Sequence, residues 1–192
     1  MTYLILGLII FLGAHSVRIV ADDWRTQTRA RLGELPWKGL YSVASLLGFG
    51  LIVWGFGLAR QHPVQLWSPP VAMRHLASLL TLISFVLLAA AYVPGNNIKA
   101  RIHHPMVLGV KVWALAHLLA NGNIAHVVLF GSFLLWAIFN FSAARRRDRA
   151  AGTQYPRGTA GATGITVAVG VGAWIAVALW LHGLLIGVRP LG

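Results

Sequence analysis

Long apolar blocks alternate with polar segments along this chain. The blocks cover residues 3–20, 40–59, 75–93, 106–120, 124–141 and 164–188. Because a bilayer core takes about 20 apolar residues per helix, each block predicts a membrane-spanning helix. The fourth block is the shortest, with 15 residues. The pattern therefore predicts an all-α fold: one polytopic membrane helix bundle, a single transmembrane domain of residues 1–192 with about six transmembrane helices.

Two of the polar segments have distinct compositions. Residues 21–39 carry charges of both signs and are expected to form an amphipathic stretch at the membrane interface, with Trp37 at headgroup depth. Residues 142–161 are rich in Arg, Gly and Thr and predict a mobile loop of 20 residues. This loop would divide the bundle into five helices plus one.

The formal net charge of +12 lies mostly on one side of the predicted bundle. The segments after the first, third and fifth blocks carry Arg25, Arg29, Arg31, Lys38, Lys99, Arg101, Arg145, Arg146, Arg147, Arg149 and Arg157. The opposite side has only Arg60, Arg74 and Arg189. The positive-inside rule places the basic segments in the cytoplasm and both termini on the far side. The charge also favours membrane lipids as partners, whereas nucleic acid is not expected, because no recognition motif accompanies it.

The chain has no cysteine and few acidic residues. The absence of cysteine excludes disulfides, thiolate catalysis, iron–sulfur clusters and covalently attached haem. The acidic residues all lie in predicted polar segments: Asp22, Asp23, Glu34 and Asp148. Carboxylate proton relays and carboxylate-bridged metal pairs within the bilayer are therefore not expected.

Ionisable side chains within the apolar blocks are the candidate functional residues, because such groups usually mark a site in a membrane helix. His15 lies in GAHSVRI, and Arg18 shares its helix face three residues later. The structural alternative for His15 is a hydrogen bond to a backbone carbonyl, and Arg18 can instead extend to the headgroups. In HHPMVLGVKVWALAHLLANGN, residues 103–123, His104 and Pro105 are expected to begin the fourth helix.

His117 is the best partner for His15. His104 and His117 are 13 residues apart, about 20 Å along a helix, so they cannot bind one ion. Counted from the basic side, His15 is about 8 Å deep and His117 about 17 Å deep. Helix tilt, or a flat ligand such as haem held by neutral imidazoles, can absorb this difference.

Basic residues near this pair favour an anionic ligand. No acidic residue in the apolar blocks competes for Arg18, Lys111 or Arg101, so these residues can meet the propionates of a haem or the phosphates of lipids. Trp113, one turn before His117, is expected to pack in the bundle and line the pocket.

Several stretches of the chain form a recognisable set: GAHSVRI, WKGLYSVASLLGFGLIVWG, RHLASLL, and HHPMVLGVKVWALAHLLANGN followed by LFGSFLLWA. They resemble the NnrU family over nearly the whole chain up to about Arg149. The resemblance implies a bacterial inner-membrane protein that is associated with nitrite and nitric oxide reduction. In such a membrane, the orientation expected from the basic segments puts both termini in the periplasm.

The related zeta-carotene isomerase of plants and cyanobacteria looks like a haem b enzyme. One axial histidine lies in an AHS motif and another in a W-x2-AH motif, which are the positions of His15 and His117 here. The resemblance thus implies haem b as the cofactor and these two residues as metal ligands. Where the family often reads RHP, this chain has histidine at position 103, so the role of that arginine is expected to fall to Arg101, two residues away.

Three functions are consistent with these features. The first is a haem b protein that supports denitrification, by redox sensing or electron transfer with nitrogen-oxide reductase components. The second is a haem-dependent isomerase of a polyene or another hydrophobic small molecule, and the third is a haem-free assembly factor. The HP-x3-G element also resembles the RHPxYxG motif of membrane methyltransferases, but those need C-terminal acidic residues that residues 164–188 lack.

Overall fold

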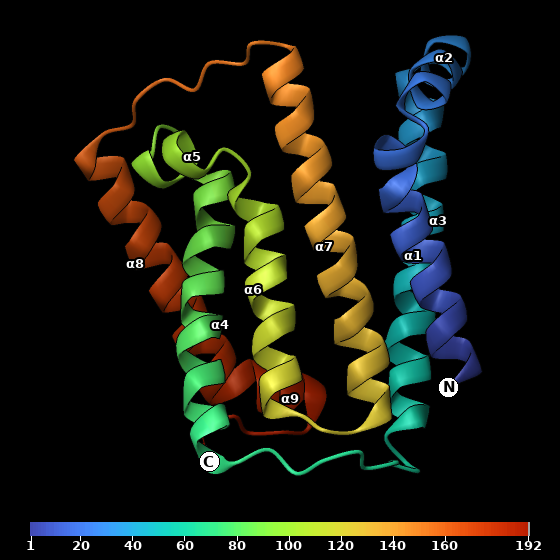
Figure 1. Ribbon diagram of the computed structural model, residues 1–192, viewed down its shortest axis with the longest axis vertical. Helices are drawn as coiled ribbons and strands as arrows, with labels where there is room; N and C mark the ends of the chain where they lie inside the picture. Colours follow the sequence, from blue (N-terminus) through green and yellow to red (C-terminus); the bar gives the residue numbers. More distant parts are fainter. Residues whose placement is uncertain (192) are drawn as a thin grey trace.

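A computed structural model describes residues 1–191 and shows an all-helical bundle (Figure 1). The elements are α1 (Thr2–Val20), α2 (Asp22–Leu32), α3 (Glu34–Ala59), α4 (Val71–Tyr92), α5 (Asn97–Ile102), α6 (Pro105–Ala120), α7 (Ile124–Ala150), α8 (Ala160–Ala176), the π-helical turn η1 (Val177–Leu181) and α9 (His182–Ile186). No strand occurs within residues 1–191. The predicted fold class is confirmed.

Five helical segments are long and apolar enough to cross a membrane: α1, α3, α4, α7 and the continuous stretch from α8 to α9. α6 is apolar too but has only 16 residues. Large side chains on the outward faces remain exposed, such as Leu47, Leu184 and Leu185. Such broad apolar exposure fits a surface covered by lipid rather than water.

α7 stands between two groups of helices. α1 and α3 form a close pair on one side, while α6, α4 and α8 follow in that order on the other (Figure 1). Leu4 and Leu8 of α1, Ile52 of α3, Ala114 of α6 and Phe130 of α7 meet in one buried core cluster. The core therefore lies around α7, where both groups of helices meet.

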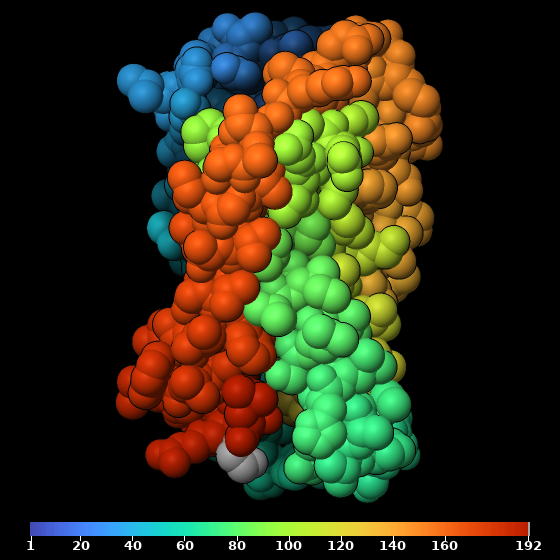
Figure 2. Space-filling model, turned by 90° about the vertical axis from the view of Figure 1, so that its left-hand side faces the viewer, coloured from blue at the N-terminus to red at the C-terminus, as the bar shows by residue number. Residues whose placement is uncertain are grey.

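Small residues and side-chain hydrogen bonds contribute to the close helix contacts. At Gly48 of α3, an added Cβ would lie 2.7 Å from the backbone nitrogen of Phe11, so α1 and α3 approach each other closely. Figure 2 shows α8 laid along α4, where the Trp174 indole donates to the Thr81 hydroxyl at 3.1 Å.

The expectation of a 20-residue mobile loop over residues 142–161 is wrong. α7 continues to Ala150, because SAARRRDRA consists mainly of good helix formers, and only residues 151–159 connect it to α8. This connection is tied down: Thr159 N–H donates to the Gly95 carbonyl, and Asn97 N–H donates to the Thr163 hydroxyl. α3 also begins earlier than predicted, at Glu34, with Pro36 tolerated in its first turn.

The bundle has one basic end, which carries α2, α5 and the 151–159 connection and lies at the top of Figure 1. The six predicted apolar blocks run alternately toward and away from this end, so the first block begins and the last block finishes toward the opposite end. We use the name basic end below for this part of the molecule.

Candidate functional site

A cavity of about 640 Å³ opens at the basic end between α1, α2, α3, α6 and α7. This volume lies within the usual range for small-molecule sites. Five basic side chains line it: Arg18, Arg25, Arg29, Lys38 and Arg147. The acidic side chains in its wall are Glu34 and Asp148, and the histidines are His15 and His104. The basic-end cavity is therefore suited to an anionic ligand.

His15 lines the basic-end cavity and has aromatic neighbours. Its Nδ1 donates to the Phe11 carbonyl at 2.7 Å, and its ring stacks on Phe11 with centroids 4.2 Å apart. Tyr41 and the edge of Trp136 complete the surroundings, at 5.2 and 6.2 Å. The structural alternative stated for His15, a hydrogen bond to a backbone carbonyl, is therefore present. Because a carbonyl only accepts hydrogen bonds, the proton sits on Nδ1, and Nε2 keeps a free lone pair of the kind that binds metals, so this bond is compatible with both roles.

His117 has the same local geometry in different surroundings. Its Nδ1 donates to the Trp113 carbonyl at 2.8 Å, and its ring stacks on Phe130 at 4.4 Å. The His126 ring also lies near Phe130, with ring centroids 5.9 Å apart. His117 does not line the basic-end cavity. Its Nε2 is nonetheless left free for a ligand in the same way as that of His15.

Aromatic side chains separate the two histidines. Phe11 lies 5.9 Å from Phe133, and Phe133 lies 5.6 Å from Trp113. Trp113 in turn is 5.0 Å from His117, which agrees with its predicted place beside that residue. A continuous row of rings therefore links His15 to His117 and fills the space between them.

Of the predicted anion contacts, only Arg18 lines the basic-end cavity. Its guanidinium is 3.9 Å from Asp22, and its side chain is 59% exposed. Arg101 lies on α5 and is exposed, and Lys111 lies on α6 and is half-buried; neither belongs to the cavity wall. Sequence reasoning had interpreted Arg147 only as a topology signal, because nothing in the chain pattern shows that α7 extends past the bilayer.

His104 begins α6 as predicted, but it also joins a polar cluster that sequence reasoning missed. Its Nε2 donates to Asp148 at 2.7 Å, and the Tyr155 hydroxyl donates to the same carboxylate at 2.9 Å. His103 has a φ of 70°, a backbone conformation that few residues other than glycine adopt. Its ring lies flat on Tyr155 at 4.0 Å, and Arg145 donates to its Nδ1 at 2.8 Å.

Tyr155 titrates abnormally in this cluster. Burial, and then the hydrogen bond and negative charge of Asp148, raise the pKa of the Tyr155 phenol above its usual value. The hydrogen bonds of Tyr155 and His104 to Asp148 join the 151–159 connection to the start of α6 at the edge of the basic-end cavity.

Comparison with known proteins identifies the family of this chain. A family model described as NnrU protein matches residues 3–190. The chain belongs to the NnrU family. No curated protein and no solved structure matches it. NnrU membership covers nearly the whole bundle, from α1 to the segment after α9, while the relation to zeta-carotene isomerase stays a prediction.

Proposed function

We propose that this NnrU-family chain binds haem b in the membrane, with His15 and His117 as iron ligands, and supports nitrite and nitric oxide metabolism through that haem. The main supporting observation is the matched geometry of the two imidazoles. Each donates its Nδ1–H to the carbonyl four residues earlier in its own helix, at 2.7 and 2.8 Å. This arrangement orients the ring and leaves Nε2 as the basic nitrogen, as metal-binding histidines require.

The fit of a haem is good at His15 and incomplete at His117. His15 opens into a cavity of about 640 Å³, where Arg18 and Arg147 can receive carboxylates. His117 can reach the same iron only if Phe133 and Trp113 leave the space between the two histidines. We therefore expect His15 to be the stronger ligand.

The residues of the chain supply binding, orientation and exclusion of water. Phe11 and Trp136 hold the His15 ring from two sides, and the core around Phe130 keeps water from the deeper region. Bound haem would supply reversible one-electron chemistry. We place the basic end in the cytoplasm of the bacterial cell by the positive-inside rule, which puts both termini in the periplasm.

The absorption spectrum of the purified protein tests this proposal. We expect a low-spin b-type reduced-minus-oxidised spectrum that is lost in His15→Ala and in His117→Ala. His62→Ala is the matched control, because His62 is exposed in the connection between α3 and α4. An unchanged spectrum in His117→Ala would remove His117 from the site. Colourless protein made with ample haem would refute haem binding and leave the assembly-factor hypothesis.

The nitrogen-oxide part of the proposal has its own test. Reduced protein is exposed to nitric oxide, and a shift of the haem absorption bands is expected. Retention of the unshifted spectrum contradicts a direct role with nitric oxide. Incubation of the reduced protein with a polyene, followed by analysis of product isomers, then tests the isomerase hypothesis separately.

A further inference from the structure

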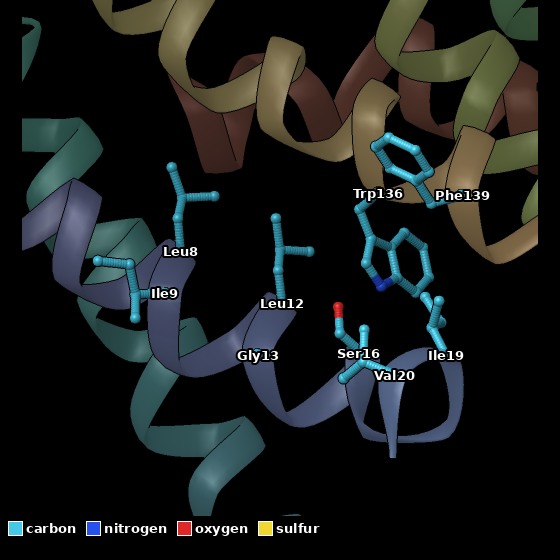
Figure 3. A pocket seen from close by; sticks show the side chains of 9 residues that line it. All are labelled: Leu8, Ile9, Leu12, Gly13, Ser16, Ile19, Val20, Trp136 and Phe139. Carbon is cyan, nitrogen blue, oxygen red and sulfur yellow. The ribbon is translucent and has the colours of Figure 1, made fainter. Parts of the chain in front are cut away.

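An apolar groove runs along the outside of the bundle between α1 and α7 (Figure 3). Its volume is about 310 Å³, and its wall consists of Leu8, Ile9, Leu12, Gly13, Ser16, Ile19, Val20, Trp136 and Phe139. From Leu8 to Val20 the groove extends about 18 Å along α1. That length is close to one leaflet of a hydrocarbon core about 30 Å thick. The groove thus spans roughly the depth of one acyl chain.

Polar groups interrupt this apolar wall near its basic end. The indole Nε1 of Trp136 is buried and has no hydrogen-bond partner. In Figure 3 the indole nitrogen and the Ser16 hydroxyl point toward each other, about 6 Å along the helix from Val20. An unpaired donor is costly at membrane depth, so this position favours a ligand that carries an acceptor oxygen.

Two arginines of the basic-end cavity lie next to the end of the groove. Arg147 donates to the backbone carbonyl of Arg18 at 3.3 Å, and Arg18 directly precedes Ile19 in the groove wall. Within residues 1–191, Arg147 makes no ion pair, and the only carboxylate paired with Arg18 is Asp22 at 3.9 Å. Asp148, next to Arg147 in the sequence, is already bound by His104 and Tyr155. The pair therefore keeps positive charge available at headgroup depth.

We propose that an anionic phospholipid from the leaflet at the basic end binds here. One acyl chain fills the α1–α7 groove, an ester carbonyl lies at the level of Ser16 and Trp136, and the phosphate lies between Arg18 and Arg147. Basic pockets between membrane helices on the cytoplasmic side bind anionic headgroups in this way. The lipid site shares Arg18, Arg147 and Trp136 with the surroundings of the proposed haem, but its groove lies on the outer face of α1 and α7 and needs neither histidine.

Tryptophan fluorescence with brominated lipids tests this site. The full-length protein in detergent is titrated with phosphatidylglycerol or phosphatidylcholine that carries brominated acyl chains, which quench nearby indoles. We expect phosphatidylglycerol to quench at a several-fold lower lipid fraction. Trp136→Phe should remove the lipid-specific quenching, whereas Trp180→Phe should retain it, because Trp180 is 59% exposed on the distant turn η1.

Adjacent arginines provide the matched charge control. Arg147→Ala should weaken the preference for phosphatidylglycerol about fivefold, the loss expected for one cation near an anionic surface. Arg146→Ala should not, because Arg146 is exposed and lies outside the cavity wall. Arg147→Lys, which keeps the charge, should retain most of the preference and shows that the effect is not caused by misfolding.

Several outcomes would overturn the proposal. Equal quenching by both lipids, or equal losses in Arg146→Ala and Arg147→Ala, would mean only general attraction to the basic surface. Displacement of the lipid by millimolar inorganic phosphate would indicate a free-anion site without an acyl chain. His15→Ala should leave the lipid preference intact, so a loss of haem and a loss of lipid binding can be told apart.

Discussion

The close packing of α1 on α3 predicts that Gly48→Ala disturbs the surroundings of His15. A Cβ at position 48 would lie 2.7 Å from the Phe11 nitrogen and 2.9 Å from its Cα and Cβ. Ordinary contact begins near 3.4 Å, so α1 and α3 must separate by about 0.7 Å at this level. Phe11 supplies the carbonyl that holds the His15 ring.

Gly50→Ala is the matched control, because a Cβ there meets nothing within 4 Å. Both substitutions gain about 1 kcal/mol of helix propensity, so the difference between the variants isolates the steric overlap. Overpacking costs about 1–3 kcal/mol. For a chain of this size, about 2–4 °C of melting temperature corresponds to 1 kcal/mol. We therefore expect Gly48→Ala to melt about 2–12 °C below Gly50→Ala.

Thermal unfolding in one detergent, followed by the loss of helical circular dichroism, measures this difference. If haem binds at His15 as proposed, the haem spectrum should also change in Gly48→Ala and stay normal in Gly50→Ala. Equal melting temperatures for the two variants would refute the close approach of α1 and α3 at this level. A lower melting temperature for Gly50→Ala would refute it as well.

Two further predictions concern the ends of the bundle. Because the raised pKa of Tyr155 keeps the phenol protonated in the folded state while the unfolded chain ionises, stability should be constant below about pH 10 and fall as the pH rises above it. Tyr155→Phe, compared with the parent by thermal unfolding at pH 8 and pH 11, should reduce this fall, and an unchanged fall would exclude Tyr155 as a cause. At the opposite end, Gly122→Ala should lower the melting temperature, because its Cβ would collide with the Trp67 backbone, whose N–H donates to the Gly122 carbonyl. Gly131→Ala, where a Cβ meets nothing within 4 Å, is its control, and equal melting of these two variants would contradict the packing at Gly122.

The sequence predicts the membrane helices well, because the requirement for apolar residues is local and long. It does not predict the last turns of α7, since Arg145–Arg149 leave the hydrophobic pattern although the helix continues. For the same reason, the sequence does not show that Arg147 lines the basic-end cavity. Hydropathy indicates where a chain enters the bilayer, whereas it contains no information on helical structure outside it.

The candidate site also has features that the sequence predicts and features that it does not. The chain pattern singles out His15 and His117, because ionisable groups are rare within apolar blocks. It does not show that Phe133 lies between them, or that His104 shares a cavity with His15, because both facts depend on how α1, α6 and α7 are placed side by side. Depth along a helix is computable from residue counts, but lateral position in a bundle is not.

The position of α7 has a consequence for how the molecule can open. Among the helices, the backbones of α1, α2 and α3 approach the remainder of the bundle closely only at α7. The basic-end cavity lies along this single seam, with His15 on one side and His104 on the other. If α1, α2 and α3 shift together against α7, the cavity widens or narrows while α4, α6 and α8 keep their packing. Ligand entry would then be a hinge movement rather than a local unfolding of any helix.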